Sequence, residues 1–175
     1  SNKDEIMAFT NKHQVYKAKV DDFTDTKASV LGEYVPAKLN MEEGEETVFI
    51  TVFCEYKGYM IFIFENGKLA KVDMSSYETK TNRKKLINAF SDKSPLACAF
   101  YISEDKDIVI CAENGRKLLL NTAVITSKST KNTQGVQVIK LKKRNDKVSS
   151  AHFYTEGEFE KEWRFRAKTL PAAGA

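Results

Sequence analysis

A chain of 175 residues suffices for one ordinary domain, and its 42% hydrophobic and 30% charged residues exclude a disordered or fibrous protein. The longest apolar run, Met60–Phe64, is far shorter than the roughly 20 residues of a membrane-spanning helix, so no membrane partner is expected. The net charge of +4 is unevenly spread, since residues 1–55 carry −5, residues 56–104 carry +3 and residues 105–155 carry +6. This gradient favours a polyanionic partner.

Short segments rich in β-branched and aromatic residues follow one another along the chain, and this pattern predicts strands. The predicted strands are Ile6–Phe9, Val15–Val20, Thr47–Cys54, Tyr59–Phe64, Lys68–Val72, Ala97–Ile102, Ile108–Ala112, Lys117–Leu120, Val136–Leu141 and Val148–Tyr154. Turn residues separate them. At Asn66-Gly67 and Asn114-Gly115 a type I′ hairpin turn is expected, because both central residues of that turn need positive φ.

The tail carries two competing patterns. Segment 158–166 has glutamate–arginine pairs four residues apart, as in a helix, and three aromatic residues at odd-numbered positions, as on one side of a strand. We expect a short helix that ends before Pro171 and packs Trp163 on the last of the units that precede it.

One phrase, an apolar run followed by a turn and then basic residues, occurs three times, as Ala8–Lys17, Ile63–Lys71 and Cys111–Leu119. The asparagines of the three phrases lie 55 and 48 residues apart, a spacing close to that of architectures in which each unit buries a face against its neighbour. The predicted domain therefore covers residues 4–155, in blades of about 4–55, 56–104 and 105–155, and the tail covers residues 156–175.

The sequence lacks the residue patterns that carry catalysis or bind metals. Neither His13 nor His152 has a second ligand at metal spacing, and no G-x-S-x-G, Walker-type or G-x-G-x-x-G run exists. The acidic segment 42–46 is expected to be a solvated turn, because nothing apolar flanks it to shift a pKa. We therefore predict no catalytic residue, cofactor, metal site or small-molecule substrate for this chain.

The turn, the cations after it and a later Gly-Val element resemble the C-terminal domain of the A subunit of bacterial type IIA topoisomerases, DNA gyrase and topoisomerase IV. The matching segments are Asn66–Lys71, Asn114–Lys117 and Thr133–Leu141, with Gly32–Val35 in the first unit. The first unit has His13 in place of the turn glycine, and the second lacks the later glycine. The resemblance covers about residues 4–155.

This resemblance implies an all-β fold, a β-pinwheel or propeller-like arc of about three antiparallel four-stranded blades with a short helical or extended tail. It also implies sequence-independent binding and bending or wrapping of duplex DNA on a basic rim. The implied setting is the bacterial cytoplasm, at the nucleoid, and the implied protein partners are the ATPase B subunit of the holoenzyme together with the rest of the A subunit. The family's cleavage tyrosine follows an arginine, and no tyrosine here does, so the ATP-dependent isomerase chemistry is expected elsewhere in the holoenzyme.

Gyrase A subunits carry a Q-R-R-G-G-K-G box, and its absence here favours a topoisomerase IV-like protein over gyrase. A propeller-like protein-interaction module is the other alternative, although the single tryptophan is followed by arginine and the chain has no Gly-His pair, unlike WD40 blades. The candidate DNA-binding residues are the cations beyond the turns and on the polar loops of the second and third units. They are Lys68, Lys71, Arg83, Lys84, Lys85, Arg116, Lys117, Lys128, Lys131, Lys142, Lys143 and Arg144.

Overall fold

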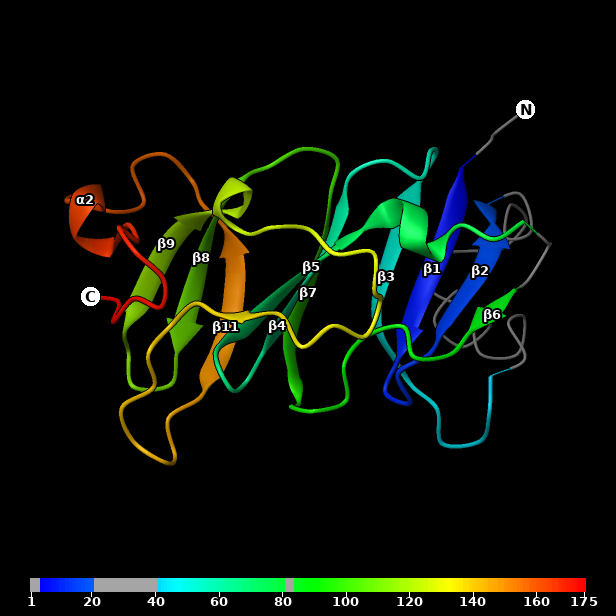
Figure 1. The fold of residues 1–175 in the computed structure, drawn as a ribbon, viewed down its shortest axis with the longest axis horizontal. Coiled ribbons are helices and arrows are strands. Elements are labelled where there is room, and N and C mark those ends of the chain that lie inside the picture. The colour runs from blue at the N-terminus through cyan, green and yellow to red at the C-terminus, as the bar shows by residue number, and fades with distance from the viewer. Residues whose placement is uncertain (1–3, 21–40, 81–83) are drawn as a thin grey trace. The chain divides into compact units, whose positions relative to one another are not determined.

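The computed structural model describes residues 4–20, 41–80 and 84–175, which are mostly strands and connecting loops (Figure 1). Helix in these ranges is short and includes the 3₁₀ turns η2 (Met74–Tyr77) and η3 (Thr122–Val124) and the α-helix α2 (Glu162–Phe165). No helix among the described residues is long and apolar enough to cross a membrane. The predicted all-β class with little helix is confirmed.

Two compact units make up the chain, one formed by Ser1–Lys57 with Tyr77–Phe90 and the other by Gly58–Ser76 with Ser91–Ala175. The first unit holds a four-stranded antiparallel sheet, in the order β3 (Thr47–Phe53), β1 (Glu5–Thr10), β2 (Val15–Lys19) and β6 (Lys85–Leu86). Its core includes the fully buried Phe9, whose ring centroid lies 5.5 Å from that of Tyr77 and 6.3 Å from that of Phe90.

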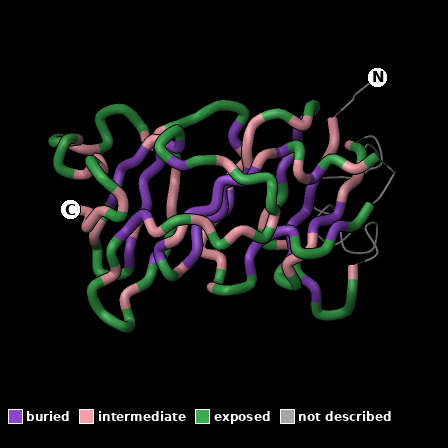
Figure 2. The backbone as a smooth tube through the Cα atoms, in the orientation of Figure 1, coloured by how far each residue is buried: buried purple, intermediate pink, exposed green. Residues whose placement is uncertain are grey.

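The second unit holds two antiparallel sheets. One has the order β10 (Val136–Gln137), β5 (Lys68–Asp73), β4 (Tyr59–Phe64) and β7 (Leu96–Ile102), and the other has the order β11 (Val148–Phe153), β8 (Asp107–Ala112) and β9 (Lys117–Asn121). Alternate residues of the two sheets, such as Ile61 and Ile63 of β4 and Ile108 and Ile110 of β8, share one hydrophobic core. Figure 2 shows this burial concentrated on the central strands. The last sheet has three strands, where four were predicted.

In each four-stranded sheet, one edge strand comes from the segment that was predicted to form the following blade. Strand β6 lies in the stretch predicted as the second blade and pairs with β2, and β10 lies in the predicted third blade and pairs with β5. The pairing of β10 with β5 requires a glycine at position 135. Gly135 has φ +78°, and an added Cβ would lie only 2.1 Å from the carbonyl oxygen of Leu69 on β5. The glycine before Val136 is therefore required by the close approach of two backbones.

The hairpin turns differ from the predicted type I′ form. Strands β4 and β5 are joined by three residues, of which Gly67 alone has positive φ (84°), and its N–H donates to the carbonyl of Phe64 at 3.0 Å. Asn66 instead accepts the N–H of Lys68 on its side-chain oxygen at 3.1 Å. This is the three-residue loop in which a type I turn is followed by a left-handed residue. His13 occupies the left-handed position in the first unit (φ 59°).

The tail follows the outer edge of β9. The N–H of Ala167 donates to the carbonyl of Leu119 at 2.8 Å, and Lys117 and Ala175 exchange two backbone hydrogen bonds of 2.9 and 3.0 Å. This edge corresponds to the one that β10 occupies on β5. The predicted short helix is present as α2, but the prediction that Trp163 packs on the protein is wrong, since 69% of Trp163 is exposed.

Candidate nucleic-acid interface

Three loops of the second unit meet at one end of its sheets, and we call residues 65–68, 113–117 and 142–148 the turn edge. Backbone hydrogen bonds join the loops, because Val148 donates to the carbonyl of Glu65 at 3.0 Å and Glu113 donates to the carbonyl of Lys147 at 2.9 Å. The side-chain amide of Asn114 lies 3.4 Å from a carboxylate oxygen of Asp146. The turn edge is thus a continuous surface held by the ends of β4, β5, β8, β9 and β11.

Positive charge is concentrated on the turn edge, which carries seven lysines and arginines against three acidic residues. Of the three acidic residues, Glu113 forms an exposed ion pair with Lys147 at 3.6 Å. The side chains of Lys142, Lys143 and Arg144 are exposed and form no ion pair or hydrogen bond within the described part of the chain. Their charges are therefore available to an anionic partner.

The structure separates the candidate residues into groups. Lys68, Arg116, Lys117, Lys142, Lys143 and Arg144 lie on the turn edge. Lys128 lies at the opposite end of β5, where its backbone pairs with Lys71 and Asp73, and Lys131 follows on the same connection. Lys84 and Lys85 belong to the first unit, and Arg83 lies outside the described residues.

Lys71 is the candidate that the structure contradicts. Its side chain is 5% exposed, and its ammonium lies 2.8 Å from a carboxylate oxygen of Asp105, 3.1 Å from the carbonyl oxygen of Thr122 and 4.2 Å from the ring centroid of Tyr59. The hydrogen bond from Lys71 holds the pKa of Asp105 below its ordinary value. Lys71 lies on the same face of β5 as Leu69, which belongs to the hydrophobic core, so its side chain is directed into the protein and it is a structural cation.

The corresponding turn of the first unit is acidic, and its cation is already paired. Lys12 lies 3.3 Å from Glu42, and the prediction of a solvated acidic turn holds for Glu42, which is exposed. The prediction is wrong for Glu45, which is 6% exposed and accepts hydrogen bonds from the hydroxyls of Thr10 and Tyr16. Burial alone would raise the pKa of Glu45, but these hydrogen bonds outweigh it and the pKa is lowered.

Sequence reasoning also missed a cleft beside the turn edge. Trp163, Arg164 and Lys168 line it, and Arg116 of the turn edge donates to the carbonyl of Ala173, a further lining residue, at 3.4 Å. No sequence motif predicts this cleft, because the cleft forms only where the tail folds back over β9. Its one sequence signal is a lone tryptophan next to an arginine.

No family model matches the chain. Its sequence is 22% identical over 162 residues to the DNA gyrase A subunit of Mycobacterium bovis (strain BCG / Pasteur 1173P2), and the same figures hold for Mycobacterium tuberculosis (strain CDC 1551 / Oshkosh). These matches cover 91% of this chain and 19% of each gyrase protein.

Solved C-terminal domains share the fold. That of DNA topoisomerase IV aligns with a TM-score of 0.67 at 19% identity, covering 88% of this chain and 48% of that one. The C-terminal domain of DNA gyrase A aligns with a TM-score of 0.57 at 18% identity, covering 86% of this chain and 48% of that one. The C-terminal domain of E. coli ParC aligns with a TM-score of 0.58 at 11% identity, covering 86% of this chain and 56% of that one.

These likenesses confirm the predicted resemblance and the β-pinwheel class of fold. The chain spans about a fifth of the length of the curated relatives and about half of the first two solved domains.

Proposed function

We propose that this chain is an accessory domain of a type IIA topoisomerase A subunit, which binds and bends duplex DNA without reading its sequence. The observation that carries the proposal is the turn edge, where cations from three loops converge and those of residues 142–144 have no partner in the described part of the protein. The fold shared with topoisomerase IV and gyrase A domains supports it.

The turn edge suits phosphate rather than base recognition. Its cations are on loops, so they can meet successive phosphates without entering a groove, and the arginines can bind a phosphate through two N–H groups. The sheets beneath fix the spacing of these loops. Affinity therefore depends on charge and on how readily the duplex bends, and it is nearly independent of base sequence.

The finer assignment rests on the sequence. We infer a topoisomerase IV-like parent rather than gyrase, because the chain lacks the Q-R-R-G-G-K-G box. Strand cleavage is assigned to the rest of the A subunit, ATP hydrolysis to the B subunit, and the setting to the bacterial cytoplasm. The remaining candidate cations, Lys84, Lys85, Lys128 and Lys131, stay predictions of weaker contacts.

Binding of a labelled random-sequence duplex, measured by fluorescence anisotropy across salt concentrations, tests the proposal. With about six phosphate contacts, log K should fall with log salt at a slope near −5. Changing Lys142→Glu and Arg144→Glu together removes two contacts, so the slope should flatten by about 2 and the affinity at 0.1 M salt should fall roughly 60-fold.

A matched control reverses two charges away from the turn edge. Lys106 lies on the β7–β8 connection and Lys80 follows η2, and both are exposed and outside the set of candidate DNA contacts. Lys106→Glu with Lys80→Glu makes the same change in net charge and should leave most of the affinity intact. Equal losses in the two double variants would show that net charge, and not the turn edge, governs binding.

A further inference from the structure

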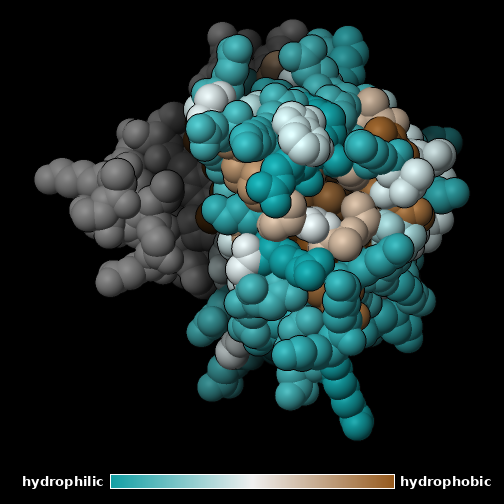
Figure 3. Space-filling model, turned by 90° about the vertical axis from the view of Figure 1, so that its left-hand side faces the viewer, coloured by the Kyte–Doolittle hydropathy of each residue, from teal (hydrophilic) through white to brown (hydrophobic). Residues whose placement is uncertain are grey.

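The tail forms a cleft on the side of the second unit that carries α2. The cleft has a volume of about 320 Å³, and its lining includes Leu118, Trp163, Phe165, Lys168 and Ala172. Figure 3 faces this side and shows hydrophobic residues exposed in a hollow among hydrophilic ones. Clefts of roughly 300–1,000 Å³ are the size that encloses a small ligand or one group of a larger one.

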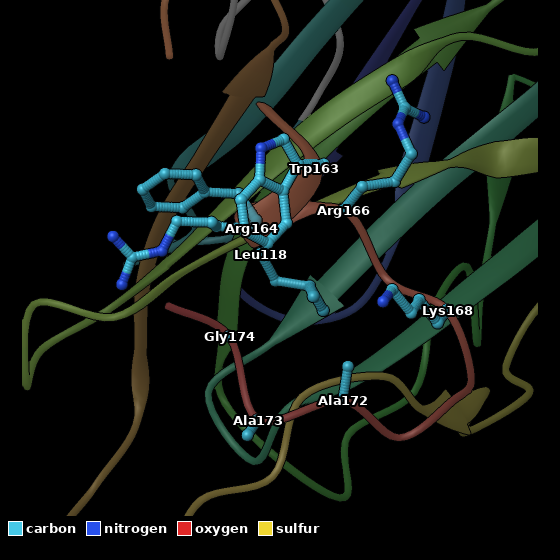
Figure 4. A pocket seen from close by; sticks show the side chains of 9 residues that line it. Leu118, Trp163, Arg164, Arg166, Lys168, Ala172, Ala173 and Gly174 are labelled. Atoms are coloured by element: carbon cyan, nitrogen blue, oxygen red, sulfur yellow. The ribbon is translucent and has the colours of Figure 1, made fainter. Parts of the chain in front are cut away.

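Trp163 is presented at this cleft rather than buried. It is the only tryptophan of the chain and 69% of it is exposed, more than any other large hydrophobic residue described. Phe165 anchors the short helix instead, since its ring stacks on Phe159 with centroids 4.0 Å apart and planes 9° apart. In Figure 4, Trp163 lies on one side of the hollow, with Ala172 and Ala173 on the other.

The cations of the cleft differ in how far they are neutralised. Arg166 donates two hydrogen bonds of 3.1 Å to Asp107 and also pairs with Glu162, and these bonds raise its pKa. Arg164 and Lys168 are exposed and have no hydrogen bond or ion pair from their side chains within the described ranges. No acidic side chain is among the residues that line the cleft. It therefore combines an open aromatic face with two free positive charges.

The cleft adjoins the turn edge. Arg116 donates to the carbonyl of Ala173 at 3.4 Å, and the ammonium of Lys117 lies 6.0 Å from the ring centroid of Phe159. A DNA backbone on the turn edge would thus pass close to Trp163. An intact duplex, whose major groove alone is about 12 Å wide, cannot enter a cleft of about 320 Å³. The faces of its bases are also covered by their stacked neighbours.

We propose that this cleft binds an unpaired nucleotide of DNA, with its base stacked on Trp163 and its flanking phosphates held by Arg164 and Lys168. The proposal rests on the proposed function in one respect, since the turn edge would bring a gapped or frayed duplex to the cleft, whereas a free single strand needs only the cleft. Stacking on an aromatic side chain accepts every base, and the free cations supply the backbone contact. The ligand class is single-stranded DNA, such as a gap or an unpaired end.

Because Trp163 is the only tryptophan, its fluorescence reports on this cleft alone. The full chain is titrated with a twelve-nucleotide oligo-dT and with an abasic oligomer of the same length. Saturable quenching by oligo-dT and little by the abasic strand are expected, because the abasic strand has phosphates but no base to stack. Equal quenching by the two strands, or none by either, would overturn the proposal.

Variants separate this cleft from the turn edge. Trp163→Leu should weaken binding of labelled oligo-dT by about 5- to 150-fold, the usual value of one stacked base, while Trp163→Phe keeps most of the affinity. Lys142→Glu with Arg144→Glu should weaken duplex binding and leave quenching by oligo-dT nearly unchanged. Failure of duplex binding in the unchanged protein would refute the proposed function, whereas unchanged oligo-dT affinity in Trp163→Leu would refute the cleft alone.

Discussion

Replacing Lys71 with methionine removes a buried ammonium group, while the methionine side chain takes the place of the apolar stem of the lysine. The variant loses the 2.8 Å ion pair with Asp105 and the 3.1 Å hydrogen bond to Thr122. Hydrogen bonds to charged groups contribute roughly 1.5–3 kcal/mol each, and Asp105 recovers hydration because its side chain is 34% exposed. We therefore expect a loss of about 2 kcal/mol, which lowers Tm by about 4–8 °C in a chain of this size.

Thermal unfolding followed by circular dichroism measures this effect, and Lys68→Met is the matched control. Lys68 lies at the turn end of the same strand and its ammonium has only a 3.4 Å contact with Gln134, so its replacement should change stability by less than about 0.5 kcal/mol. The effects on DNA binding should be the reverse of those on stability. Lys68→Met should bind duplex DNA more weakly, and Lys71→Met should bind it as tightly as the unchanged protein. An unaltered Tm together with weakened DNA binding in Lys71→Met would refute the structural role of Lys71.

Gly135→Ala should lower the stability of the second unit by at least about 2 kcal/mol, because the new Cβ lies 2.1 Å from a carbonyl oxygen of β5. Gly115→Ala, which meets nothing within 4 Å, should cost about 1 kcal/mol, and equal Tm values for the two would contradict this account. Removing residues 162–175 uncovers the edge of β9 and should cause self-association in sedimentation velocity; a truncated protein that stays monomeric would refute the capping role of the tail. The hydrogen bond from Arg166 lowers the pKa of Asp107, so its stabilisation is present above the unfolded value of about 3.9 and is lost as pH falls through the lowered value. Asp107→Asn should therefore flatten the fall of Tm below about pH 4, and an unchanged profile would contradict the pairing.

The strands and their class were predictable because their signals are local. The continuous apolar runs Ile6–Phe9 and Ile108–Ala112 and the turn glycines at 67 and 115 need no information from distant residues. The finer geometry of the turn was not predictable in this way. A type I turn with a left-handed glycine and a type I′ turn both suit Asn-Gly, so the dipeptide does not distinguish them, and in the structure Gly67 alone has positive φ.

Part of the candidate interface was predictable for the same reason. Cations that follow directly on a hairpin turn, such as Lys68 and Lys117, reach the turn edge because strands β4 and β8 end there together. Lys71 is three residues beyond Lys68 and equally basic, yet its strand position faces a second sheet and Asp105. The sequence alone could not separate these lysines, because charge is visible in it and burial is not.

The sequence by itself determined the repeated hairpins, the predominance of strand and the excess of positive charge in the later units, because each depends on neighbouring residues or on composition. The tertiary structure decided which segments cross between sheets, how the edge of β9 is covered and where Trp163 lies. Two-residue strands such as β6 and β10 have too little pattern of their own, so their pairing depends on the edge available to them. The tail likewise takes its path from the unpaired N–H and C=O groups of β9, which only a folded sheet presents.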